Sequence, residues 1–449
     1  MEILKRHVDI DMRPFEEEVP TITRYGLPLD VKFCKKCVIS NQRPNSVVEI
    51  KNAVDAVKPV IHFNKGGMCD ACEVVEEKNN HINWEERERE LRDLCDRYRR
   101  SDGRYDCIVP GSGGKDSFFT SYKLKYKYGM HPLTVTWAPH LYTSWGYRNF
   151  QEWIASGMDN FLITPNSKTH RLLTRLATEV LLHPFQPFFI GQKNIAPKLA
   201  AQMNIPLIFY GENQAEYGNP KKENDRATMN PSFFSLEDKE SVRIGGVTYR
   251  ELMECFGIDN NELDIYLPIT SDQLKEHDIQ VHYLGYYEKW HPQEVYYFAV
   301  ENGGFRPSPE RSPGTYTKYS SIDDKMDDLN FYTTFIKFGI GRATYDAAQE
   351  IRHGEITRDE GVALVQKYDG EWPERFEEEL WDYLSIMPEE YPLASKMFEE
   401  PRMDKEYFLD ICNRFRSPHI WKYQDGKWIL RKAVYGNSIY NNMWWKTKI

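Results

Sequence analysis

Residues 111–117 bring together several groups that are suited to phosphate chemistry. The run reads Gly-Ser-Gly-Gly-Lys-Asp-Ser, and glycines let a backbone turn tightly and come close to a ligand. An apolar strand predicted over 107–109 leads into the run, and a helix is predicted over 118–128, whose unpaired N–H groups favour an anion. We predict that phosphate groups of a ligand bind to Gly111, Ser112, Gly113, Gly114, Lys115, Asp116 and Ser117.

Lys115 and Asp116 are the predicted catalytic residues of this loop. Lys115 supplies a positive charge, and Asp116 supplies a carboxylate for Mg²⁺, which prefers oxygen ligands. The loop is not a Walker A motif, because Lys115 is followed by Asp116 and the spacing from the first glycine is too short. A simple glycine turn is the alternative interpretation.

The segments around the loop alternate between strand and helix patterns. Further strands are predicted over 131–138, 159–164 and 205–210, and helices over 146–156, 168–182 and 190–203. This order predicts an α/β fold with a doubly wound parallel sheet, in which ligands lie at the carboxyl ends of the strands. Trp137 and Ala138 end the second strand, where they could face the adenine of ATP or provide ordinary strand packing.

A second polar stretch follows the strand at 205–210. Glu212 and Asn213 are predicted to be catalytic, either by binding Mg²⁺ or by orienting the substrate and ammonia. Glu216 and Tyr217 are predicted to contact the substrate. The stretch lies opposite the phosphate loop, which favours these roles over a helix cap or a turn.

Four of the cysteines form two Cys-x₂-Cys pairs. Four thiolates are the closed tetrahedral set of a structural zinc site, and they leave no open position for a substrate. We therefore predict an N-terminal zinc ribbon, and four buried free cysteines are the alternative. The predicted zinc ligands are Cys34, Cys37, Cys69 and Cys72.

The run Ser-Gly-Gly-Lys-Asp-Ser at 112–117 resembles the SGGxDS motif of the PP-loop ATP pyrophosphatases, such as GMP synthetase and tRNA-lysidine synthetase. This resemblance implies a sheet of the PP-loop type and a loop that holds the β- and γ-phosphates of ATP. It also implies that an oxygen of the substrate attacks the α-phosphate, which gives an adenylated intermediate and pyrophosphate.

Further motifs, in the same order along the chain, make the resemblance more specific. They are Cys34-Lys-Lys-Cys-Val-Ile-Ser-Asn-Gln-Arg-Pro44, Gly-Gly-Met-Cys-Asp-Ala-Cys72, Gly-Glu-Asn-Gln-Ala-Glu-Tyr-Gly218, Asp323-Asp-Lys-Met-Asp-Asp-Leu329 and Phe335-Ile-Lys-Phe-Gly-Ile-Gly-Arg-Ala-Thr344. Together they resemble, over residues 30–370, the bacterial N-acetyl sugar amidotransferases, which make acetamidino sugars for O-antigen and for pseudaminic or legionaminic acid glycans. The resemblance implies an N-acetylated sugar as substrate, either a nucleotide sugar or a nonulosonic acid.

The source of ammonia is predicted to be a separate glutaminase subunit. Residue 2 is Glu, so the chain lacks the N-terminal Cys nucleophile of one glutaminase class. No other cysteine in the sequence is flanked by glycines and has a plausible histidine partner, as a nucleophilic cysteine of a glutaminase would need. The family resemblance also suggests a separate subunit.

Four cations in the C-terminal half are candidate site residues. Arg306 and Arg311 lie in the loop 305–320 and could hold the acidic or nucleotide-bearing end of a sugar, although such a loop could simply face solvent. Lys337 and Arg342 lie in a helical pattern over 323–353. They are predicted to neutralise the α-phosphate or the leaving pyrophosphate, and surface charges on a helix are the alternative.

The 449 residues allow several domains. We predict an N-terminal arm with the zinc ribbon at 1–78 and an ATP pyrophosphatase domain at 79–225. An insertion at 226–277 is expected to be mobile and near the active-site rim. A mainly helical region at 278–449 would contact the substrate or a partner.

The net charge of −10 argues against broad electrostatic capture of nucleic acid. No apolar run approaches membrane-spanning length and no signal peptide is evident, so we expect a cytoplasmic protein. The alternative function is a tRNA-modifying PP-loop enzyme of the thiolase or lysidine-synthetase type, disfavoured by the charge and by the lack of a third Cys-x₂-Cys pair. A non-catalytic nucleotide-binding scaffold is a further alternative.

Overall fold

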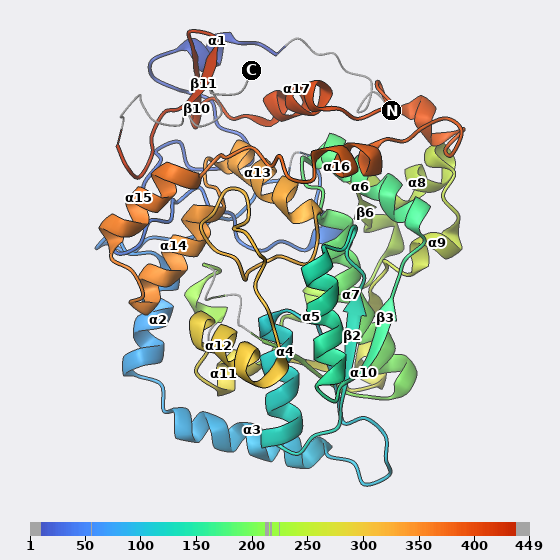
Figure 1. The fold of residues 1–449 in the computed structure, drawn as a ribbon. Helices are drawn as coiled ribbons and strands as arrows, with labels where there is room; N and C mark the ends of the chain where they lie inside the picture. Colours follow the sequence, from blue (N-terminus) through green and yellow to red (C-terminus); the bar gives the residue numbers. More distant parts are fainter. Residues whose placement is uncertain (1–9, 55, 212–214, 216–217, 224, 437–449) are drawn as a thin grey trace.

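A five-stranded parallel sheet forms the centre of the protein (Figure 1). The computed structural model describes residues 10–54, 56–211, 215, 218–223 and 225–436. The strand order is β3-β2-β1-β4-β9, and all four neighbouring pairs are parallel, which confirms the predicted α/β fold. The strands are β1 (Cys107–Pro110), β2 (Pro132–Trp137), β3 (Asp159–Ile163), β4 (Leu207–Tyr210) and β9 (Gln280–Tyr283).

Helices cover both faces of this sheet. Successive side chains of a strand point to opposite faces, so Ile108 packs in the core that contains α6 and α7, whereas Cys107 and Val109 pack in the core that contains α3 and α11. Burial on both faces explains why the sequence of β1 is continuously apolar and why every residue of β2 is buried. These four helices are α3 (Trp84–Tyr98), α6 (Ser167–Leu181), α7 (Gln186–Met203) and α11 (Leu284–Tyr287).

Three helices pack around the phosphate loop and the chain that directly follows it. α4 (Lys115–Tyr122) begins earlier than predicted and continues into a π-helical turn, Lys123–Lys127. α12 (Pro292–Gly303) packs along α4, where the rings of Phe119 and Phe298 are 5.1 Å apart. α5 (Ser144–Ala155) lies on the other side of the loop.

The C-terminal region is mainly helical, as predicted. The helical pattern over 323–353 is divided by Gly339, whose φ of +66° ends a helix in the left-handed region. Thr357 and Glu360 form a capping box at the start of the next helix. The helices are α13 (Met326–Phe338), α14 (Arg342–His353), α15 (Arg358–Tyr368), α16 (Glu377–Leu384) and α17 (Lys405–Phe415).

The segment 226–277 packs on the outside of the sheet. It contains an antiparallel hairpin, and Val242, Ile244 and Leu252 are buried in the core that α6 and α7 share. Gly245 lies so close to α6 that a Cβ there would be 2.7 Å from Leu176 Cβ. We expected a mobile insertion at the active-site rim, and the segment instead buries apolar side chains against α6. Its elements are β5 (Ser235–Leu236), β6 (Arg243–Ile244), β7 (Val247–Thr248), α8 (Tyr249–Phe256), α9 (Asn260–Asp264), β8 (Ile269–Thr270) and α10 (Ser271–Glu276).

The N-terminal arm and the C-terminal hairpin lie side by side (Figure 1). α1 (Arg13–Glu16) contacts the hairpin of β10 (Trp421–Gln424) and β11 (Lys427–Leu430), and the rings of Phe15 and Trp428 are 5.0 Å apart. Asp425 and Gly426 form the turn of that hairpin, both with positive φ. Across the described ranges, no helix is long and apolar enough to cross a membrane.

Candidate functional site

The glycine loop between β1 and α4 has a backbone that only glycine can adopt. Gly113 has a φ of +85°, and a Cβ at this position would lie 2.6 Å from the Cα of Phe150 in α5. At Gly111, a Cβ would collide with the side chain of Ser117. The loop is therefore folded tightly against α4 and α5, and its backbone can come close to a ligand.

The start of α4 presents polar groups suited to phosphate. Gly114 is the N-cap and offers no side chain to the first N–H groups of the helix, so these donors remain for an anion. Lys115 is buried, and its Nζ donates to Oδ1 of Asp116 at 2.6 Å. Ser117 Oγ donates to the carbonyl of Gly114 at 3.1 Å. The predicted phosphate-binding residues are thus brought together.

Asp323 joins this loop from the distant C-terminal region. The hydroxyl of Ser112 is within hydrogen-bonding reach of the Asp323 carboxylate. Burial raises the pKa of Asp323, and the bond from Ser112 opposes that rise. The backbone is fixed as well, because Thr143 N donates to the Asp323 carbonyl at 3.0 Å. The sequence analysis did not single out Asp323 as a site residue, although the acidic run 323–328 within the family motif was an available signal.

Asp324, the next residue, has a structural role. Its Oδ2 accepts from both the amide and the ring Nδ1 of His140 at 2.7 Å. Its Oδ1 accepts from the amides of Leu141 at 3.3 Å and Met326 at 3.0 Å. These bonds hold the loop after β2 against the start of α13, and they keep Asp323 in place beside Ser112.

Two further aspartates complete an acidic cluster at the start of α13. Asp328 is bound by Arg375, whose Nε donates to its Oδ2 at 2.6 Å. Asp327 is 8% exposed, and within the described part of the chain its carboxylate makes no hydrogen bond or ion pair. Burial raises its pKa strongly, and the neighbouring carboxylate of Asp323 adds to the rise. Asp327 is therefore a buried carboxyl group whose ionised form is disfavoured, and a bound cation would stabilise that form.

Arg342, at the start of α14, lies near this cluster. It is 2% exposed, and its charge lowers the pKa of Asp327 against the rise that burial causes. Its Nη2 donates to the carbonyls of Ser320 and Ser321, whereas Nε and Nη1 have no hydrogen-bond partner among the residues described. Two buried donors thus remain to meet an anion.

Trp137 and Lys337 are both buried and make contacts within the protein. Trp137 is 3% exposed, and its indole fills the space over Gly191 in α7, an arrangement that the strand-packing interpretation expects. Ala138 is also buried, and its amide donates to the carbonyl of Ile163. Lys337 is buried with its Nζ donating to the carbonyl of Leu181 at 2.7 Å, at the end of α6. Burial lowers the pKa of Lys337 strongly.

The two arginines of the loop 305–320 differ in their surroundings. Arg311 is engaged by Glu371 through two hydrogen bonds of 2.6 Å. Arg306 has an exposed side chain, and its backbone is clamped by Asn149, whose carbonyl lies beside Gly113 of the phosphate loop. Only Arg306 is thus placed near the loop with its charge available. The predicted residues Glu212, Asn213, Glu216 and Tyr217 lie outside the described residues.

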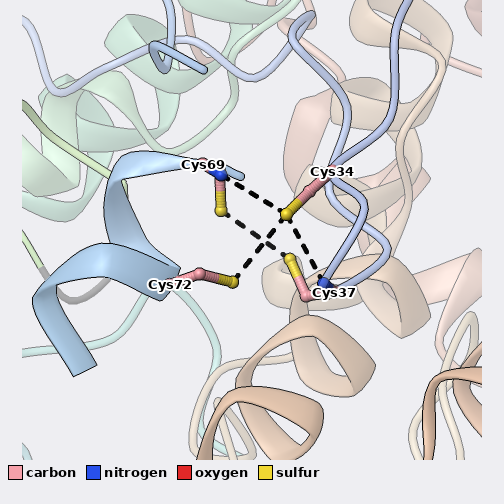
Figure 2. Close-up of side chains that lie close together, drawn as sticks. All are labelled: Cys34, Cys37, Cys69 and Cys72. Atoms are coloured by element: carbon pink, nitrogen blue, oxygen red, sulfur yellow. Dashed lines mark hydrogen bonds between the residues drawn. The ribbon is translucent and has the colours of Figure 1, made fainter. Parts of the chain in front are cut away.

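The two Cys-x₂-Cys pairs converge on one point (Figure 2). The Sγ atoms of Cys34 and Cys72 are 3.8 Å apart, as are those of Cys37 and Cys69, and all four lie within 4.8 Å of one another. Sulfurs at about 2.3 Å from a tetrahedral zinc ion are about 3.8 Å apart. The amides of Cys37 and Cys69 donate to Cys34 Sγ at 3.4 Å. The four cysteines therefore fit a single tetrahedral ion.

α14 connects this cysteine cluster to the rest of the site. Near its C-terminus, the buried guanidinium of Arg352 is within hydrogen-bonding reach of the Cys37 sulfur. Arg358 of α15 donates to the carbonyl of Cys37 at 3.3 Å. Since Arg342 begins α14 near the acidic cluster, one helix runs from the cysteine cluster to the carboxylates beside the phosphate loop.

Comparison with known proteins identifies the C-terminal region. Residues 313–435 match the family model for the C-terminal domain of WbpG-like LPS biosynthesis proteins. This region includes the acidic cluster, Arg342 and Arg352. Comparison with the curated proteins gave no match.

Among solved structures, the chain is similar to the U34-tRNA thiolase NcsA from Methanococcus maripaludis, which carries a 4Fe-4S cluster. The identity is 13%, the alignment covers 72% of this chain and 86% of that chain, and the TM-score is 0.25. A TM-score this low supports no conclusion about the chemistry of this chain.

Proposed function

We propose that this chain is an ATP-dependent amidotransferase that converts the N-acetyl group of a sugar into an acetamidino group for surface-glycan biosynthesis. The observation that supports it most is that Asp323 packs against the start of α5, the helix that also packs on the phosphate loop, and so lies near Ser112. Ser112 belongs to a loop suited to phosphate, and Asp323 belongs to the region that matches the WbpG-like domain. A phosphate loop and a domain of LPS biosynthesis thus contribute to one site.

The first step makes the amide reactive. An amide does not exchange its oxygen for ammonia unaided, because that oxygen is a poor leaving group. In the proposed step, the amide oxygen bonds to the α-phosphorus of ATP, and the bond from that phosphorus to the bridging oxygen breaks to release pyrophosphate. Lys115 and the N–H groups at the start of α4 stabilise the negative charge, and Ser112 and Ser117 orient the phosphates.

The carboxylates beside the loop fit Mg²⁺. Hard divalent cations prefer oxygen ligands, and such a cation would stabilise the ionised form of the buried Asp327 carboxyl, whose pKa is raised next to Asp323. We propose that Mg²⁺ bound to the phosphates of ATP takes further ligands from among Asp116, Asp323 and Asp327, since these three carboxylates do not all lie within 4.8 Å of one another in the structure. The ion would neutralise charge on the phosphates of ATP.

The second step replaces the activated oxygen. Ammonia attacks the imidate carbon, AMP departs with the original amide oxygen, and loss of a proton leaves the amidine. We propose that a separate glutaminase subunit supplies the ammonia. The purified chain would then hydrolyse glutamine far more slowly than it forms product from ammonium.

We further propose that the cysteine cluster holds structural zinc. The 3.8 Å separations fit one ion, whereas a four-iron cluster stands between its ligands and would hold their sulfurs further apart. Cysteine would fill all four coordination positions of the ion. Zinc would then fix the N-terminal ribbon, which α14 and α15 contact.

The test is pyrophosphate release with ATP, Mg²⁺ and an ammonium salt. UDP-linked diacetamido sugars, nonulosonic acids and bulk tRNA would be compared as substrates. We expect release with a sugar, together with the mass change for exchange of O by NH. Release with tRNA alone would contradict the proposal and favour a tRNA-modifying enzyme.

A further inference from the structure

The two edges of the central sheet differ in how their outer sides are covered. At one edge, the chain covers β9 itself, since Met229 N donates to the Val281 carbonyl at 2.8 Å. Tyr283 N of β9 also donates to the Ala227 carbonyl at 2.9 Å. β3 forms the opposite edge (Figure 1), and among the described residues it pairs only with β2. Within this part of the chain, β9 is thus covered and β3 is left open.

Two residues of β3 direct their backbone groups away from the sheet. The Ile163 carbonyl accepts from Ala138 N at 2.9 Å, so Ile163 faces β2. In a parallel ladder, the N–H and C=O of one residue face the same neighbour, and successive residues alternate between the two sides. Asn160 and Leu162 therefore point outward, and within the described ranges neither forms a backbone hydrogen bond on the outer side. Such unpaired groups can receive another strand.

The side chains of β3 favour pairing instead of preventing it. Phe161 is 40% exposed and Leu162 is 41% exposed, and they lie on opposite faces because side chains alternate along a strand. Natural edge strands commonly avoid pairing through Lys, Pro or a β-bulge. β3 contains neither Lys nor Pro, and its one charged residue, Asp159, is its first. The strand is therefore suited to pair with a strand of another chain.

A second copy of the same chain is complementary to this edge. When two β3 strands pair antiparallel about a two-fold axis at Phe161, Asn160 of each copy lies opposite Leu162 of the other. These residues point outward, so each pair can exchange both backbone hydrogen bonds. Phe161 then lies opposite itself in a non-hydrogen-bonded pair, where side chains come closest and two aromatic rings stabilise the contact. Asp159 lies opposite Ile163, so no like charges meet at the junction, although the net charge of the chain is −10.

We propose that two copies of this chain associate through β3, so that their sheets continue across a two-fold axis. The inference does not depend on the proposed function. Standard interfaces involve about 20–30 residues a side, and β3 supplies 5 residues, so we expect a weak dimer with a Kd in the micromolar range. β2 separates β3 from β1, whose end carries the phosphate loop. Each copy thus keeps its own loop outside the junction.

The experiment is sedimentation velocity of the full chain over a range of micromolar concentrations. We expect the wild-type chain to shift from monomer to dimer as its concentration rises. Phe161→Lys and Phe161→Glu each place two like charges opposite each other, so each should raise the Kd about tenfold or more. An equal mixture of the two variants should restore the dimer, because opposite charges then face each other across the axis.

Met253→Lys is the matched control. Met253 in α8 is 41% exposed, as Leu162 is, but it lies outside the sheet, so its replacement should leave the Kd unchanged. A wild-type chain that stays monomeric over the whole range would overturn the inference, as would dimers that persist undiminished in both Phe161 variants. Two monomeric variants that form no dimer when mixed would show that residue 161 does not face its own copy, which overturns the proposed pairing. The measurement needs no turnover, so none of these outcomes bears on the proposed function.

Discussion

The Ser112 hydroxyl lies within hydrogen-bonding reach of the Asp323 carboxylate. This proximity joins the glycine loop after β1 to the segment just before α13. The backbone of Asp323 is held independently, because Thr143 N donates to its carbonyl and a Cβ on Gly146 would collide with its Cα. Asp323 is thus close to the loop whatever the charge of its side chain. Its carboxylate can therefore be changed with little effect on the backbone.

We expect Asp323→Asn to weaken the response to Mg²⁺ while leaving the fold intact. The amide keeps the size of the side chain and can still bond Ser112, but it removes a charged oxygen ligand. The Mg²⁺ concentration for half-maximal pyrophosphate release should rise about tenfold, and kcat should fall about 100-fold. Steady-state assays over a range of Mg²⁺ concentrations check this. An unchanged Mg²⁺ response would contradict the proposed role.

Asp324→Asn is expected to act on stability. Both carboxylate oxygens of Asp324 accept hydrogen bonds, and an amide nitrogen in either position would face a donor. The cost should be about 2–3 kcal/mol of unfolding free energy, measured by urea denaturation. Asp323→Asn is the matched comparison. Equal destabilisation by the two changes would mean that Asp323 is also a structural residue.

Local pattern was sufficient to predict the central sheet and the two ligand-rich motifs. Apolar runs such as 107–109 are buried on both faces of the sheet, so a continuous apolar run in the sequence directly indicates a central strand. The glycine loop and the paired cysteines have fixed spacing along the chain, and their geometry follows from that spacing. These features needed no knowledge of distant contacts.

The contacts that the sequence could not predict join distant parts of the chain. Lys337 is predicted to neutralise phosphate, and in the structure its Nζ donates to the Leu181 carbonyl because α13 packs near the end of α6. Arg311 donates hydrogen bonds to Glu371, and the indole of Trp137 packs over Gly191. Asp323 reaches Ser112 only through the folded C-terminal region. A single sequence does not reveal which distant residue meets a given side chain.

Zinc removal should loosen the contact between the N-terminal ribbon and α14. The buried guanidinium of Arg352 lies beside the Cys37 sulfur, and a buried charge without its counter-charge is destabilising. We expect Cys72→Ser to lower the zinc content from one ion per chain and to increase proteolysis near α14 and α15. Atomic absorption and limited proteolysis measure the two effects.

Cys95→Ser is the matched control for this change. Cys95 is buried but stands apart from the four clustered cysteines, so its replacement should leave the metal content unchanged. Iron and sulfide in stoichiometric amounts in the purified protein, with visible absorption that Cys72→Ser removes, would show that the site holds an iron–sulfur cluster and that zinc is the wrong assignment.

Acid should destabilise the protein through His282 of β9. Burial lowers the pKa of His282 from 6.5 to about 4, and its ring contacts Tyr287 OH at 2.7 Å. Between these pKa values the unfolded chain binds a proton that the folded chain does not, so stability present above pH 6.5 is lost as the pH falls toward 4. Between pH 7 and 5.5 this loss amounts to about 1 kcal/mol.

Replacing the histidine should remove this part of the pH dependence. We expect the unfolding free energy of His282→Gln, measured in urea at pH 7 and 5.5, to fall by about 1 kcal/mol less than that of the wild type. His81→Gln changes an exposed histidine that is solvated alike in both states, so it should keep the wild-type dependence. If His282→Gln and the wild type lose equal stability, the His282 ring is protonated in the folded protein and its burial does not exclude the charge.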